Sequence, residues 1–90
     1  MKAEDVLAKL FTRAGRVPPV NALETLQSLG LTGTVGQFIE EQEELTEKHR
    51  KNFAIETSVK LGKANWPSIA KFRLLSMLNM EAVKQESFDR

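Results

Sequence analysis

The fold is decided by the stretch of residues 66–84, which reads WPSIAKFRLLSMLNMEAVK. Asn65 is placed to cap a helix here, and Pro67 is tolerated in a first helical turn. At about 100° per residue, the apolar side chains of this stretch go nearly all the way round the helix. A helix that is apolar on every side is a buried one. We therefore predict a buried helix from about Trp66 to Lys84.

Little else in the chain is available to cover such a helix. The protein has 90 residues, and a chain of this size buries only about 60–65% of the surface that its unfolded form exposes. We therefore expect a second copy to cover part of the helix, which makes the protein a homodimer. The residues expected on this partner or dimer surface are Leu75, Met77, Leu78 and Met80.

Working outward from this segment, helical spacing of apolar residues predicts three further helices and no strand. The four predicted helices cover about residues 2–14, 22–29, 35–61 and 66–84. The first two are short, the third is long and central, and the fourth is the apolar one. The fold class is therefore all-α: a small bundle of about four helices. We expect a single helical domain over residues 1–90, with a frayed tail at about residues 85–90.

Residues that start and stop helices mark the boundaries. Gly15 and Gly30 are placed to follow helix ends, where glycine accepts a left-handed backbone. Asn21 and Thr34 are placed as N-caps, each with a Glu or Gln three residues later, as in a capping box.

The predicted helix over residues 35–61 would run about 40 Å at 1.5 Å per residue. Its acidic residues come first and its basic residues last, which suits the helix dipole. Near its end, Ile55 and Val59 lie on a different face from Phe53. The helix therefore either contacts two partners there or bends.

Charge is distributed unevenly. Residues 34–47 hold five Glu and no basic residue, whereas residues 48–75 hold seven basic residues and one Glu. The acidic patch comprises Glu40, Glu41, Glu43, Glu44 and Glu47. The basic patch comprises Lys48, Arg50, Lys51, Lys60, Lys63, Lys71 and Arg73, with Trp66 as an aromatic residue for stacking. Lys and Arg near an exposed aromatic side chain suit phosphates and bases.

Several classes of function lack the residues they need. Without cysteine the chain has no disulfide or thiol chemistry, and a small domain without such staples is typical of the cytoplasm. His49, the one histidine, lies in a charged run without a nucleophile or orienting acid beside it. No Glu stands three residues before it, as a helical metal site requires. We therefore expect that the protein is not an enzyme and that it uses no cofactor, metal or small-molecule substrate. We also expect no membrane association, because no apolar run approaches about 18 residues.

The segment Leu29-Gly30-Leu31-Thr32, between two predicted helices, resembles the turn of a helix-turn-helix DNA-binding unit. The resemblance covers residues 23–40 and implies that the helix after Thr34 is the recognition helix. The chain departs from the family pattern at Leu26, where a small residue is usual, and at Gly36, where an apolar residue is usual. Glutamates on the recognition helix would also repel phosphates. An ordinary helical hairpin is the alternative.

Two functions follow as hypotheses. The first is a non-enzymatic interaction or regulatory module, such as an adaptor or inhibitor, that presents helical surface to a macromolecular partner. The acidic and basic patches would then set orientation and association rate more than affinity. The alternative is a small DNA- or RNA-binding regulator that uses the basic patch and the degenerate helix-turn-helix-like segment.

Overall fold

The computed structural model describes residues 1–13 and 15–80, and within them the chain forms five α-helices and no strand. The helices are α1 (Ala3–Arg13), α2 (Ala22–Ser28), α3 (Val35–Glu43), α4 (Glu47–Gly62) and α5 (Ser68–Met77). The all-α class is confirmed, with one helix more than predicted. The expected continuation of the last helix over residues 81–84 and the tail at 85–90 lie outside the described residues. None of the described helices has the length and apolar character to cross a membrane.

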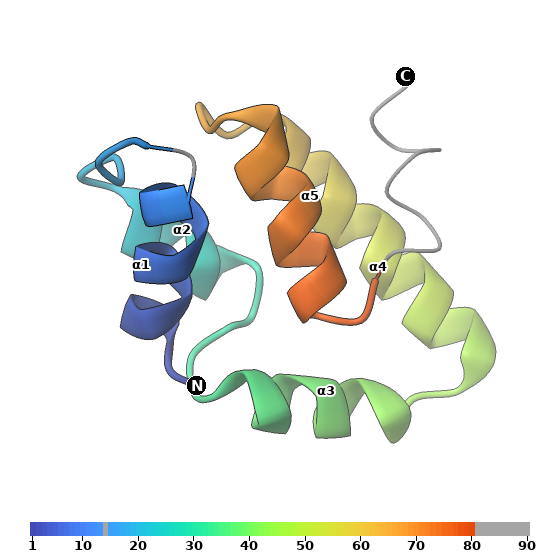
Figure 1. The fold of residues 1–90 in the computed structure, drawn as a ribbon. Coiled ribbons are helices and arrows are strands. Elements are labelled where there is room, and N and C mark those ends of the chain that lie inside the picture. Colours follow the sequence, from blue (N-terminus) through green and yellow to red (C-terminus); the bar gives the residue numbers. More distant parts are fainter. Residues whose placement is uncertain (14, 81–90) are drawn as a thin grey trace.

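The helices pack around α1 and α5. The helix α1 contacts both α2 and α5, and α5 in turn contacts α4. In Figure 1, α3 runs across one end of the molecule and starts beside the N-terminus. Two backbone interactions tie these parts together: Val35 N donates to Met1 O at 2.8 Å, and Lys2 forms an isolated antiparallel bridge with Thr34.

The core is built from side chains of α1, α2 and α5 and the end of α4. Phe11, Leu26, Leu61 and Leu74 are each at most 1% exposed. Trp66, just before α5, packs its ring edge-on to Phe11, with centroids 5.2 Å apart and planes at 76°. Burial of such side chains is the main source of stability in a domain of this size.

The predicted partner surface lies mostly inside the chain itself. Leu75 and Leu78 are 0% exposed and Met80 is 3% exposed within the single chain, while Met77 is partly buried. Of the apolar residues of α5, Ile69 remains 49% exposed. The helix is shorter than predicted, and its neighbours cover most of its apolar surface. The excess of apolar surface that motivated a homodimer is therefore absent from α5, and the oligomeric state stays a prediction.

The prediction of one long helix over residues 35–61 is wrong. The chain forms α3 and α4 instead, separated by Glu44, Leu45 and Thr46. Thr46 has an extended backbone (φ −63°, ψ 158°), and its side chain accepts a hydrogen bond from the His49 N–H. Threonine competes with helical hydrogen bonding and favours such cap positions.

Aromatic packing explains why the chain turns at this point. In a continuous helix, Phe38 and Phe53 would lie about 22 Å apart along the axis. In the folded chain their ring centroids are 5.6 Å apart. The break between α3 and α4 therefore lets both rings reach the same part of the core, which no single straight helix allows.

Among the described residues, each of three helices is followed by a residue with a left-handed backbone. Gly15 (φ 69°) follows α1 and Gly30 (φ 101°) follows α2, as predicted, and Asn79 (φ 62°) follows α5. The N–H groups of Asn79 and Met80 donate back to carbonyls of α5 at 3.1 and 2.8 Å, which is the Schellman pattern. At the start of α2 the prediction is wrong, because the Asn21 side chain makes no cap hydrogen bond.

Candidate functional site

A polar cavity of about 240 Å³ lies between α3 and the connector that precedes it. Three of the five glutamates of the acidic patch line it: Glu40, Glu41 and Glu44. The remaining lining residues are Gly30, Thr32, Gly33, Thr34, Gln37 and Phe38. The structure therefore gathers part of a predicted charged surface around a concave feature that the sequence did not indicate.

A second, more apolar hollow of about 220 Å³ adjoins the first. The two share Gly30, Phe38 and Glu41. The second is completed by Gln42, Leu45 and Phe53. We call the combined feature the acidic groove: one part is lined by carboxylates and the other by aromatic and aliphatic side chains.

Local hydrogen bonds fix the shape of the connector wall. Thr34 caps α3 through a full capping box, since the Thr34 hydroxyl accepts from Gln37 N (3.1 Å) and the Gln37 side chain accepts from Thr34 N (3.0 Å). A Cβ added at Gly33 would collide with Oε1 of Gln37. Glycine at this position therefore leaves room for the capping box that holds the start of α3.

Two of the lining residues, Phe38 and Gln42, also fix α3 to the core. Gln42 is 5% exposed, and its Nε2 donates to the carbonyl oxygen of Leu78 at 3.1 Å. Phe38, on the same helix as Gln42, is 4% exposed and packs against Phe53 of α4. These two residues hold α3 in place, so the glutamates between and beside them project from a positioned helix.

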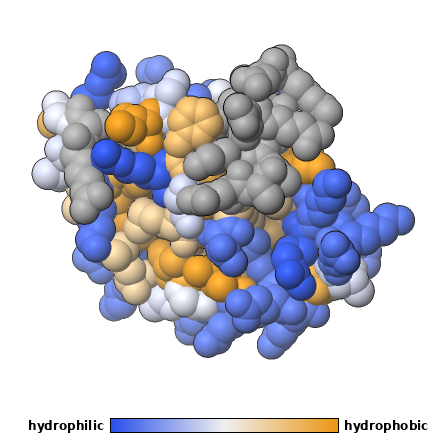
Figure 2. All heavy atoms as spheres, turned by 45° about the vertical axis from the view of Figure 1, so that its right-hand side comes forward, coloured by the Kyte–Doolittle hydropathy of each residue, from blue (hydrophilic) through white to orange (hydrophobic). Residues whose placement is uncertain are grey.

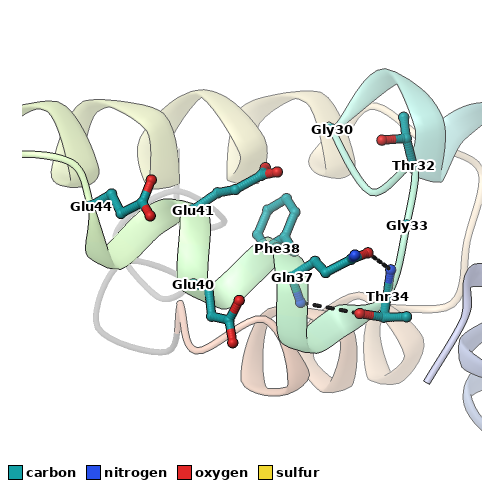
Figure 3. Close-up of a pocket in the computed structure, with 9 residues that line it drawn as sticks. All are labelled: Gly30, Thr32, Gly33, Thr34, Gln37, Phe38, Glu40, Glu41 and Glu44. Carbon is teal, nitrogen blue, oxygen red and sulfur yellow. Dashed lines mark hydrogen bonds between the residues drawn. The ribbon is translucent and has the colours of Figure 1, made fainter.

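The side chains of the groove point in two directions. Figure 3 shows the Glu41 carboxylate beside the Phe38 ring, on the side of α3 that faces the connector, whereas Glu40 projects from a different side. Carboxylates only accept hydrogen bonds when ionised, and their charge attracts cations. The arrangement therefore suits a positively charged, hydrogen-bond-donating group.

The basic patch does not form one surface. Lys48, Arg50 and Lys51 are exposed on the first turns of α4, and Lys60 and Lys63 are exposed at its other end. At 1.5 Å per residue the two groups lie about 18 Å apart along the helix. All residues from 43 to 52 are exposed, and hydrophilic side chains crowd the right-hand side of the molecule in Figure 2.

The remaining members of the basic patch have structural contacts. Trp66 is 7% exposed and packs on Phe11, so its ring is not placed to stack on a nucleic-acid base. Lys71 Nζ donates to the Gly62 carbonyl at the end of α4, at 2.9 Å. Arg73 is half-buried on α5 and lines a separate cavity. These three residues therefore do not enlarge the positively charged surface that the exposed Lys and Arg side chains of α4 form.

The helix-turn-helix resemblance receives little support from the geometry. Residues 29–34 connect α2 to α3, whereas a helix-turn-helix unit has a turn of about three or four residues. The exposed part of α3 carries Glu40, Glu41 and Glu43. Carboxylates on a recognition helix would repel the phosphates of DNA.

The remaining candidate chemistry is metal binding or catalysis by acidic side chains and His49. Among the described residues, no group of three or more His, Asp or Glu side chains is placed to hold a metal ion. His49 is exposed, as predicted for a solvated helix-surface histidine. No protein-family model, curated protein or solved structure matches the chain.

Proposed function

We propose that the protein is a non-enzymatic interaction module that binds a basic segment of a macromolecular partner in the acidic groove. The observation that carries this proposal is the position of Glu40, Glu41 and Glu44 around a cavity whose lining also includes Phe38. A patch of glutamates on a flat helix surface would attract cations without orienting them. A concave lining can also select by shape.

Arginine fits the groove better than lysine. A guanidinium group presents a planar fork of N–H donors that matches carboxylate geometry. Hydrogen bonds between such charged groups are about twice as strong as neutral ones. The neighbouring hollow beside Leu45 and Phe53 would hold an apolar residue next to the arginine.

The test is fluorescence anisotropy with labelled peptides of equal length that alternate arginine, glutamate or serine with leucine. We expect the arginine peptide alone to bind. The variant Glu40→Gln/Glu41→Gln/Glu44→Gln should weaken binding by about tenfold or more, equivalent to about 1.4 kcal/mol.

A matched control removes the same charge outside the groove: Glu43→Gln/Glu47→Gln/Glu56→Gln. If both triple variants weaken binding equally, the attraction depends only on net charge and the groove has no role. Failure of the arginine peptide to bind at low salt would also contradict the proposal.

A nucleic-acid function remains the second candidate because Lys48, Arg50 and Lys51 are exposed together at the start of α4. Phosphate contacts by these residues would give affinity that falls steeply with salt concentration. Binding of labelled duplex DNA and single-stranded RNA, lost in Lys48→Gln/Arg50→Gln/Lys51→Gln but kept in the groove variant, would favour this candidate over the peptide-binding function.

A further inference from the structure

A cavity of about 400 Å³, separate from the acidic groove, lies between α1 and α5. Its lining combines apolar and cationic side chains from the two ends of the described chain: Met1, Lys9, Leu10, Arg73, Ser76 and Met77. Concave, largely apolar cavities of about 300–1,000 Å³ with a few convergent polar groups are typical of small-molecule sites. Flexible methionine side chains allow such a lining to adapt to different apolar groups.

The cavity has two cationic groups, one from each helix. Lys9 is exposed on α1, and Arg73 is half-buried on α5. The Nη1 atom of Arg73 is buried without a hydrogen-bond partner. Only Ser58 shares this condition among the buried side chains that the structure describes.

A guanidinium nitrogen in this condition is energetically costly. The Arg73 side chain is only half-buried as a whole, but a buried donor atom without a hydrogen-bond partner loses the bonds that it would make to water. Arg73 belongs to α5 and lines the cavity together with Lys9 and Leu10 of α1. No Asp or Glu is among the lining residues, so an anion bound in the cavity would supply the negative charge that its lining lacks; because Nη1 itself is buried, the anion would act through the charge of the guanidinium group as a whole.

We propose that this cavity binds a small organic carboxylate with a short apolar tail. The carboxylate would pair with Arg73 and Lys9, and the tail would lie against Leu10 and Met77. A phosphate or nucleic-acid backbone would use the cations but not the apolar lining. This site does not depend on the acidic groove, so its test and that of the proposed function are independent.

The experiment is a titration of the ¹⁵N-labelled protein with octanoate, followed by two-dimensional NMR, with octanamide as the uncharged analogue. We expect octanoate to shift the amide signals of residues near the cavity, such as Leu10 and Met77. Octanamide should bind at least about tenfold more weakly.

Two variants assign the charge. Arg73→Met should weaken octanoate binding by about tenfold without lowering thermal stability, because it removes the unpartnered buried nitrogen. Lys9→Met changes an exposed residue and should weaken binding with the fold intact, which keeps the test decisive if Arg73→Met fails to fold. Arg50 does not line this cavity. The Arg50→Met variant should therefore bind octanoate as tightly as the unmodified protein does.

Several outcomes would overturn the proposal. These are octanamide binding as tightly as octanoate, unchanged octanoate binding in the foldable variants at both cations, and octanoate shifting only residues elsewhere. Binding of a glutamate–leucine peptide at this cavity, with no response to octanoate, would assign the site to a protein partner and would equally overturn the small-molecule proposal.

Discussion

The core and the turn between α3 and α4 are opposite in character. Phe11, Leu26 and Leu74 are at most 1% exposed, whereas every residue from 43 to 52 is exposed. Stability and surface charge are therefore carried by different parts of the chain. Charged residues around the turn can be exchanged without disturbing the packing that maintains the fold.

The helix α3 joins these two regions. It carries most of the acidic patch on its outer surface, and it is attached to the rest of the chain through Phe38 and Gln42. By contrast, α1 packs along both α2 and α5. We expect α3 to open at a lower free energy than α1, because a helix with fewer buried contacts unfolds locally more easily.

The largest effect is expected in the core. Leu74→Ala removes a side chain that is 0% exposed and should lower the free energy of unfolding by about 2–5 kcal/mol. Ile69→Ala is the matched control on the same helix, where the side chain is 49% exposed. It should change the free energy of unfolding by only about 0.5 kcal/mol. Urea denaturation measures both.

Equal losses in these two variants would mean that both sides of α5 are buried in solution. A second copy of the chain covering Ile69 would explain such a result, so sedimentation over a range of concentrations would accompany it. A single species with the mass of one chain, together with unequal losses, would place the burial of α5 within the chain itself.

The attachment of α3 predicts a smaller effect. Gln42→Leu removes the donor to the buried Leu78 carbonyl and should cost about 1–3 kcal/mol. Hydrogen exchange of α3 amides should accelerate more than that of α1 amides. Gln27→Leu, at an exposed position on α2, is the control and should leave hydrogen exchange in α3 unchanged. Equal exchange rates of the α3 amides in the two variants would show that the Gln42–Leu78 hydrogen bond does not hold α3 in place.

The smallest effect is expected at the turn itself. Thr46→Ala removes the hydroxyl that accepts from His49 N and should cost about 1 kcal/mol. Asn21→Ala should have almost no effect, because that side chain makes no cap hydrogen bond. Thermal unfolding followed by circular dichroism distinguishes them. A gain of helix content in Thr46→Ala, without loss of stability, would show that Thr46 alone interrupts the helix predicted over residues 35–61.

Prediction from sequence succeeded where the signal is local. The helical spacing of α1, the glycines after α1 and α2, and the Thr34 capping box with Gln37 were all expected and are present. It failed at Asn21, which has the right neighbours but makes no cap bond, and at Thr46, whose role as a cap was not recognised. Both errors reflect competition between a local preference and the direction that packing imposes on the chain.

The candidate site was predictable only in part. The glutamates of the acidic patch were identified from charge, but the cavity that three of them line was not. Its wall includes Gly30 and Thr32 from the connector and Phe53 from α4. Likewise, nothing in the sequence linked Lys9 to Arg73, because their proximity depends on how α1 packs on α5.

The sequence by itself determined that the chain is helical and about where α1 and α2 begin and end, because spacing and caps act over a few residues. Only the tertiary structure decided that the long charged segment breaks at residues 44–46 and that most of the apolar surface of α5 is covered within one chain. It also decided that the acidic groove and the cavity between α1 and α5 form. Each of these depends on side chains distant in sequence meeting in the core. The free energy of that packing outweighs the local preference for a continuous helix.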